Sequence, residues 1–103
     1  MTKPQSISED QLDLMQIIEK DGKTSQRQIS KNIGFSIGKE NYCLNALLNI
    51  GFIKVINFSQ SNQKISYAYI LTPKGVKEKK AITKQFIHKK KQEYDKLVSY
   101  INK

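Results

Sequence analysis

The segment Ile33-Gly34-Phe35-Ser36 constrains the fold of this chain more than any other feature, because it joins two short stretches with helical patterning. The first stretch starts at an N-capping residue, either Thr24 or Ser25, and continues through Asn32. The second starts at the serine of the joining segment and extends to about Asn49. Glycine at a sharp bend between two short helices is typical of a helix-turn-helix, so the segment predicts that motif.

A further helix is predicted on each side of this motif. Ser8 and Gln11 have the spacing of a capping box, which predicts a first helix over about residues 9–20. Thr72-Pro73 is typical of the N-cap and first residue of a helix. This last helix should continue nearly to Lys103.

Two segments dense in β-branched and aromatic residues, 52–58 and 65–71, predict the strands of a hairpin with an exposed polar tip at residues 59–64. The order of helices and strands is that of a winged helix-turn-helix, an α+β fold that is mostly helical. The expected organisation is a flexible N-terminus at 1–7, a winged helix-turn-helix domain at 8–72 and a C-terminal helix for dimerisation at 73–103.

The net charge favours a polyanionic partner, either nucleic acid or an acidic membrane surface. The chain carries 18 Lys and Arg against 9 Asp and Glu, a formal net charge of +9. Five of these acids lie within residues 1–22, so the positive charge is concentrated in residues 23–103. No apolar run is long enough for a membrane span or a signal peptide, and the single cysteine, Cys43, excludes an internal disulfide. We therefore expect a cytoplasmic protein without a metal, a cofactor or membrane association.

Three stretches of the sequence resemble the MarR-type transcriptional regulators: 26–36, the end of the third predicted helix at 44–53, and Tyr69-Ile70-Leu71-Thr72-Pro73-Lys74-Gly75. Ile37-Gly38-Lys39 leading into Asn41-Tyr42-Cys43-Leu44 is most similar to the small exopolysaccharide (EPS)-associated branch, although Glu40 stands where an aliphatic residue is expected. The resemblance covers about residues 8–95. It implies binding to double-stranded DNA, with the third helix in the major groove and the hairpin as a wing that reaches toward an adjacent minor groove or phosphates.

The third predicted helix carries the residues expected to read DNA. Ser36 offers a hydroxyl and backbone N–H groups to a phosphate, and Gly38 allows close approach of the backbone. Lys39 reaches guanine acceptors or phosphate, Tyr42 a thymine methyl or a sugar, and Asn45 an adenine. The candidate DNA-binding set is completed by three phosphate contacts, Arg27, Lys31 and Lys64.

The opposite side of the same helix is expected to be buried. Glu40 falls on this side and needs a partner or a route to the rim, because burying an unpaired carboxylate is costly. An alternative interpretation of the outward side is that it is only the solvated surface of a packed helix. A helical wheel places Ile37, Leu44, Leu47 and Leu48 on the buried side.

The last predicted helix carries an apolar stripe too large for a small domain to bury alone, so a second copy of the chain is expected to cover it. Lys79 and Lys90 interrupt the stripe, which predicts two apolar patches with the lysine ammonium groups reaching out between them. The candidate dimerisation residues are Phe86, Ile87, Tyr94, Leu97, Val98 and Ile101.

The motif Gly34-Phe35-Ser36-Ile37-Gly38 matches the G-x-S-x-G nucleophile elbow, but that elbow requires a strand before the serine. A helix is expected there, and the single histidine, His88, lies in the lysine-rich tail, so no enzymatic activity is expected. The alternative function is a winged-helix module that binds protein or RNA without specific DNA readout. A basic surface around the third helix and wing favours DNA, whereas lysines confined to the tail favour the alternative. Whether a small-molecule effector is sensed stays open.

Overall fold

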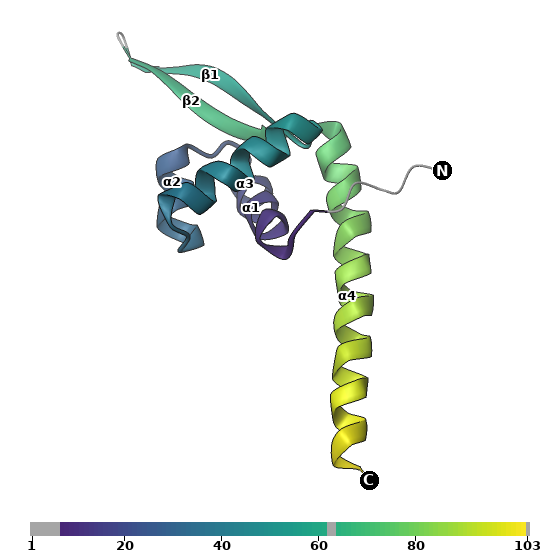
Figure 1. Cartoon of the computed structure of the whole chain (residues 1–103). Coiled ribbons are helices and arrows are strands. Elements are labelled where there is room, and N and C mark those ends of the chain that lie inside the picture. The colour runs from purple at the N-terminus through teal and green to yellow at the C-terminus, as the bar shows by residue number, and fades with distance from the viewer. Residues whose placement is uncertain (1–6, 62–63, 103) are drawn as a thin grey trace.

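The computed structural model of this chain describes residues 7–61 and 64–102, and at 58–61 and 64–66 it describes the backbone only. The elements in these ranges follow one another in the order of a winged helix-turn-helix, which confirms the predicted, mostly helical fold (Figure 1). The helices are α1 (Glu9–Asp21), α2 (Gln26–Ile33), α3 (Ile37–Ile50) and α4 (Pro73–Ile101), and the strands are β1 (Ile53–Ser61) and β2 (Lys64–Leu71). The predicted flexible N-terminus, apart from Ile7, and the hairpin tip at 62–63 lie outside the described residues.

Each helix begins at a side chain that accepts a hydrogen bond from a backbone N–H of its first turn. Thr24 does not cap α2. Instead its backbone N–H donates to the Tyr69 carbonyl oxygen at 3.1 Å, and the Tyr69 N–H donates back to the Thr24 carbonyl oxygen at 2.8 Å. This backbone bridge ties the connection between α1 and α2 to strand β2. The capping residues are Ser8, Ser25, Ser36 and Thr72.

The turn between α2 and α3 depends on Gly34. Its φ of 73° is left-handed, a conformation that glycine adopts without the steric cost that other residues pay. The chain turns there and enters α3 at Ile37, three residues later. The predicted helix-turn-helix is therefore present.

The two strands are longer than predicted. They pair antiparallel from Ile53 opposite Leu71 to Ser61 opposite Lys64, with a register irregularity between Ser59 and Ser61. The predicted polar loop at 59–64 is therefore wrong in extent. A ladder needs backbone groups rather than apolar side chains, so the polar residues next to the tip can still pair.

The core lies where α1, α2, α3, the start of the sheet and the first half of α4 meet. Gly75 lets the first turn of α4 lie against the backbone of Phe52, the residue before β1, because a Cβ atom there would sit 2.0 Å from the Phe52 carbonyl oxygen. The Thr72 hydroxyl donates to the Gly51 carbonyl oxygen at 2.6 Å and fixes the same junction. The buried hydrophobic residues of the cluster are Ile7, Leu14, Met15, Ile18, Ile29, Cys43, Leu44, Leu47, Phe52, Ile53 and Ile82.

The two halves of α4 have different environments (Figure 1). Ile82 is buried in the core, and Phe86 packs at its edge. The far half of α4 begins at Ile87. Beyond Lys90, whose side chain still reaches Glu9 of α1, it extends away from the other elements, and the molecule reaches 67 Å along its longest axis. The large side chains of this far half that are more than 60% exposed are Ile87, Tyr94, Leu97, Tyr100 and Ile101.

The two lysines that interrupt the apolar stripe of α4 both form ion pairs, but only Lys90 is exposed to solvent, at 58% against 15% for Lys79. The Lys79 Nζ lies 2.6 Å from the Glu19 Oε1, and the Lys90 Nζ lies 3.0 Å from the Glu9 Oε1. Both acids belong to α1. The prediction that the ammonium group reaches out to solvent is therefore wrong for Lys79, which is held against α1. Within the ranges that the structure describes, no helix is both long and apolar enough to cross a lipid bilayer.

Candidate nucleic-acid interface

One side of α3 faces the core, and the other faces solvent. The buried residues are Glu40, Cys43, Leu44 and Leu47. The opposite side presents amide and phenol groups without a formal charge, which suits base edges better than phosphates. Tyr42 on this side is 71% exposed. The exposed residues of this surface, which we call the reading face, are Gly38, Asn41, Tyr42, Asn45 and Asn49.

The exposed side of α3 differs from the prediction at three residues. Ile37 borders it and is 75% exposed, so the predicted place of Ile37 on the buried side is wrong. The buried side is centred near Glu40 and Leu47, which leaves Ile37, the first residue of the helix, at its edge. Asn41 and Asn49 were missed as candidates, although an asparagine recurs every fourth residue from Asn41 onwards.

Lys39 lies at the flank of the reading face and is held by α1. Its Nζ is 2.7 Å from the Asp10 Oδ2 and 4.5 Å from the centre of the Phe35 ring. Both side chains of the ion pair are more than 40% exposed. A phosphate that contacts Lys39 must therefore compete with Asp10.

The buried Glu40 carboxylate accepts hydrogen bonds from two side chains of α2. Glu40 is 1% exposed, and the Ser30 hydroxyl lies 2.8 and 2.9 Å from its two carboxylate oxygens. The Gln26 Nε2 donates to the Glu40 Oε2 at 3.2 Å and to the Asn41 Oδ1 at 2.8 Å. Burial raises the pKa of the Tyr69 phenol, and the Glu40 carboxylate raises it further. Sequence reasoning left Glu40 without a partner because its partners lie in another helix.

The remaining predicted DNA contacts are exposed but lie on different elements. Arg27 and Lys31 are exposed on α2. The Ser36 hydroxyl accepts a hydrogen bond from the Lys39 backbone N–H at 3.2 Å, so it already serves as a helix cap. A Cβ atom at Gly38 would have no described neighbour within 4 Å, which leaves room for a close approach. Lys64 is the first residue of β2, and its side chain lies outside the described part of the structure.

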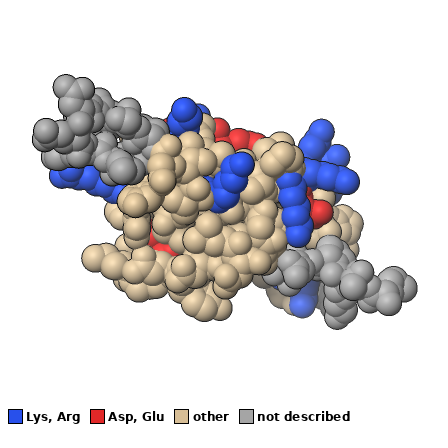
Figure 2. Space-filling view, turned by 90° about the horizontal axis from the view of Figure 1, so that it is seen from above, with Lys and Arg blue, Asp and Glu red and all other residues tan. Residues whose placement is uncertain are grey.

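Positive charge does not form one continuous field on the surface beside the wing. In the view from above, Lys and Arg side chains lie at several separate places, and neutral residues cover much of the surface between them (Figure 2). Lys54, on β1, is exposed and was not among the predicted contacts. Most lysines belong to α4, where the sequence places them at 74, 77, 79, 80, 84, 89, 90, 91 and 96.

The predicted dimerisation residues fall into two groups. Phe86 packs partly against the core, and Val98 is half-buried. The other four members are exposed to solvent, at 61% for Ile87, 67% for Tyr94, 61% for Leu97 and 82% for Ile101. Tyr100, which is 63% exposed, was not among the predicted residues.

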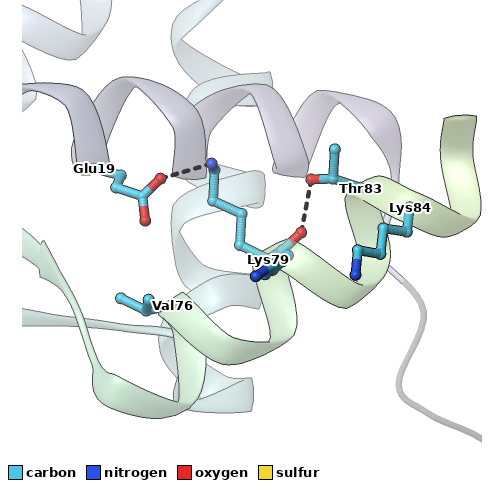
Figure 3. A pocket seen from close by; sticks show the side chains of 6 residues that line it. Glu19, Val76, Lys79, Thr83 and Lys84 are labelled. Carbon is cyan, nitrogen blue, oxygen red and sulfur yellow. Dashed lines mark hydrogen bonds and ion pairs between the residues drawn. The ribbon is translucent and has the colours of Figure 1, made fainter.

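A shallow hollow of about 420 Å³ lies between Glu19 of α1 and the first turns of α4. Figure 3 shows the Lys79 side chain crossing it to reach Glu19, and the Thr83 hydroxyl donates to the Lys79 carbonyl oxygen at 2.6 Å. The ion pair occupies Lys79, and Lys80 and Lys84 also line the hollow.

Cys43 lies in the core, 3% exposed. Burial raises the pKa of its thiol, and the nearby Asp10 carboxylate raises it further. This environment favours the protonated thiol and a packing role. Among the described residues, no group of three or more His, Cys, Asp or Glu side chains is placed to hold a metal ion.

Comparison with known proteins identifies the same fold. Residues 10–54 match a family model described as winged helix-turn-helix DNA-binding. No curated protein sequence gave a significant match.

Solved structures of MarR-like regulators superpose on most of the chain. The structure of Streptococcus pneumoniae FabT in complex with DNA is 22% identical, with a TM-score of 0.60 over 91% of this chain and 62% of that one. Lactococcus lactis ZitR, described as a zinc-responsive MarR family member, is 15% identical, with a TM-score of 0.62 over 91% of this chain and 65% of that one. Wild-type ZitR in complex with DNA is 19% identical, with a TM-score of 0.59 over 92% of this chain and 62% of that one. This chain spans less than two thirds of the length of each, and the likeness establishes the winged helix-turn-helix fold.

Proposed function

We propose that this chain is a sequence-specific, MarR-like transcriptional regulator that binds duplex DNA as a homodimer. Residues 8–72 would hold the DNA and residues 73–103 the partner subunit. The observation that carries the proposal is the reading face, an exposed and uncharged hydrogen-bonding surface on the second helix of a helix-turn-helix. The motif at 37–44 further supports a place in the exopolysaccharide-associated branch.

Base reading is assigned to α3 in the major groove. Tyr42 is 71% exposed, and its side chain would contact a thymine methyl or a sugar. Asn45 is exposed on the same side and offers an amide to adenine. Gly38 leaves open space for the backbone to approach. The N-terminus of α3 at Ser36 presents backbone N–H groups to a phosphate.

Phosphate binding is assigned to residues around the reading face. Arg27 and Lys31 on α2 are exposed. Lys39 would exchange Asp10 for a phosphate, and Lys64 would act from the wing. Contacts of this kind add affinity without sequence preference and are weakened by salt.

The first test measures the affinity for a duplex site obtained by selection from random sequences. The logarithm of the affinity should fall with the logarithm of salt concentration with a slope of about −5 to −8, since each neutralised phosphate contributes about −0.9. Tyr42→Ala or Asn45→Ala should reduce the discrimination between sites by about 1–3 kcal/mol if either residue contacts a base edge. Lys64→Ala should instead weaken binding to all DNA about equally. A flat salt dependence would reject DNA as the ligand.

The second test concerns the homodimer. Leu97→Asp together with Ile101→Asp places two charges among the exposed apolar residues of α4, so it should give a folded monomer that binds a two-fold symmetric site much more weakly. Gln92→Asp together with Ser99→Asp adds the same charge on the opposite side of the helix and should leave a dimer. A parent chain that sediments as a monomer at micromolar concentration would reject this interface.

A second candidate function is a winged-helix module that binds protein or RNA. Two observations favour this module: the Lys and Arg side chains in Figure 2 are scattered rather than gathered in one patch, and most lysines lie on α4. Competition for the parent chain between a selected DNA duplex and RNA of mixed sequence distinguishes the two functions. Equal binding to both would favour the module.

A further inference from the structure

We propose that buried Glu40 sets the hydrogen-bonding polarity of the reading face, so that Asn41 presents N–H donors rather than its carbonyl oxygen to a base edge. This inference rests on the proposed DNA-binding function and names a positioning residue for it. It also gives Glu40 a role in a place where an aliphatic residue is expected.

Glu40, Gln26 and Asn41 form a chain of hydrogen bonds, which we call the relay. It starts from the Glu40 carboxylate, which can accept hydrogen bonds but cannot donate them. A carboxylate has two oxygens and no donor. Glu40 is 1% exposed, and the Ser30 hydroxyl hydrogen already points to it from 2.8 and 2.9 Å. Any amide that approaches this carboxylate must therefore turn its nitrogen inward.

The Gln26 side chain connects buried Glu40 to exposed Asn41. Its Nε2 lies 3.2 Å from the Glu40 Oε2, so this end of the amide is the NH₂ group and not the oxygen. The same Nε2 lies 2.8 Å from an oxygen of the Asn41 side chain, which receives its second hydrogen. The carboxamide oxygen of Asn41 is thus turned toward α2, and its Nδ2 is the group left for an outside partner.

The polarity of Asn41 has a consequence for the base that it reads. In the major groove guanine, adenine and thymine offer the acceptors N7, O6 and O4, whereas cytosine offers only the N4 donor. A donor at this position therefore disfavours cytosine. An asparagine that forms two hydrogen bonds with adenine uses both its side-chain oxygen and its side-chain nitrogen. The hydrogen bond from Gln26 already engages the oxygen of Asn41, so it opposes this pairing.

Asn45 provides a matched comparison one turn further along α3. It is exposed on the same face, and the described residues give its side chain no hydrogen bond. Its amide can rotate to suit either a donor or an acceptor. Asn41 should therefore show a fixed polarity and Asn45 an adjustable one.

The experiment determines base preference by selection from random duplexes for the parent and four variants, Gln26→Ala, Glu40→Gln, Asn41→Ala and Asn45→Ala. Gln26→Ala frees Asn41 to rotate, and because Gln26 is exposed this change should not disturb folding. Glu40→Gln keeps the shape but supplies a donor, which allows both amides to reverse. Each should raise binding to cytosine at one position of the site by roughly threefold to tenfold, the effect of one hydrogen bond. Asn45→Ala should change the preference at a different position.

A second readout uses the free protein and separates this inference from the proposed function. In NMR spectra of the parent, the side-chain NH₂ hydrogens of Gln26 should exchange with water several-fold more slowly than those of Asn45, and Glu40→Gln should remove the difference. Equal exchange in the parent would overturn the relay even if the protein binds DNA.

The selection data can also overturn the inference. If Asn41→Ala changes the preference at a position that neither Gln26→Ala nor Glu40→Gln affects, Glu40 does not set the polarity. If the parent enriches no sequence while Gln26 remains protected, the proposed DNA-reading function fails and the bonded relay is only structural.

Discussion

The winged-helix body and the far half of α4 are built from similar residues but have opposite environments. In the body, apolar side chains such as Leu47 are fully buried, and the first half of α4 contributes Ile82 to the same core. In the far half, Leu97 and Ile101 are 61% and 82% exposed. The core of a single chain thus buries the first set of side chains, whereas the second set stays exposed in a single chain.

The ion pairs also differ between the winged-helix body and the far half of α4. The acids of α1 are placed opposite lysines of α3 and α4, and each of the three described ion pairs joins α1 to another helix. The acidic N-terminal part of the chain therefore balances positive charge within the molecule. Lys90 lies near the start of the far half of α4, and beyond it the described residues show no ion pair between this helix and α1.

The largest expected effect compares a core leucine with an exposed one. Leu47→Ala should lower the free energy of unfolding by about 2–5 kcal/mol, because it leaves a cavity in a packed core. Leu97→Ala should change it by less than about 0.5 kcal/mol at low protein concentration. Urea unfolding at two protein concentrations measures both.

Protein concentration sharpens that comparison. If a second copy covers the far half of α4, the loss caused by Leu97→Ala should grow with protein concentration, because the parent gains stability from association. The loss from Leu47→Ala should not. An equal loss for both variants at low concentration would mean that Leu97 is packed within one chain.

The next effect concerns the junction between the two regions. Gly75→Ala should destabilise the protein by roughly 1–3 kcal/mol, because the new Cβ atom would lie 2.0 Å from the Phe52 carbonyl oxygen and would displace the start of α4. Gly38→Ala is the control, since its Cβ atom has no described neighbour within 4 Å. It should raise the stability by up to about 1 kcal/mol through helix propensity. Thermal unfolding that shows no difference between the two variants would contradict this close contact.

A smaller effect distinguishes two ion pairs along α4. Lys79 is 15% exposed in its pair with Glu19, whereas Lys90 is 58% exposed in its pair with Glu9. Glu19→Gln should cost about 0.5–1 kcal/mol of stability, since the pair is shielded in part from water. Glu9→Gln should cost less. Both losses of stability should shrink in 1 M NaCl, because salt screens exposed ion pairs. A larger loss for Glu9→Gln than for Glu19→Gln would mean that the pair with Lys90 is the stronger of the two.

The sequence predicted the elements well where the signals are local. Helix starts depend on a capping side chain and a backbone N–H three residues later, so Ser8, Ser36 and Thr72 could be identified without any knowledge of packing. The turn at Gly34 follows from one residue type. The strand ends were missed because polar residues can pair through their backbones, and no side-chain pattern marks that.

The candidate site was less predictable because its contacts join distant parts of the chain. Asp10 and Lys39 are 29 positions apart, and nothing in either segment indicates that they pair. Glu40 depends on two side chains of α2, which become its neighbours only after the helix-turn-helix has formed. Ile37 was misplaced because a helical wheel gives the direction of a side chain but not the neighbour that covers it.

The smallest expected effect lies on α1, where it approaches the far half of α4. Partial burial raises the pKa of Asp13, and the Glu9 and Asp10 carboxylates raise it further, against a smaller opposing effect of Lys90. A carboxyl group with a higher pKa in the folded state binds its proton more tightly there than in the unfolded chain. Its contribution to stability is therefore present below the ordinary value of 3.8 and is lost as the pH rises through the raised pKa.

Asp13→Asn should accordingly make the protein more stable than the parent at pH 7, because it removes the repulsion from Glu9 and Asp10. The gain should be only about 0.3 kcal/mol, since the site is largely open to water and the repulsion is screened. At pH 3 the parent carboxyl is mostly protonated, so the difference between the two chains should disappear. Asp10→Asn is the comparison on the same helix, since Asp10 has a partner in Lys39 and its removal should not stabilise the protein at pH 7. Chemical unfolding of the three chains at both pH values measures the pattern. A loss of stability in Asp13→Asn at pH 7 would mean that attraction to the lysines of α4 outweighs repulsion within α1, and that the far half of α4 is held more firmly than its exposure suggests.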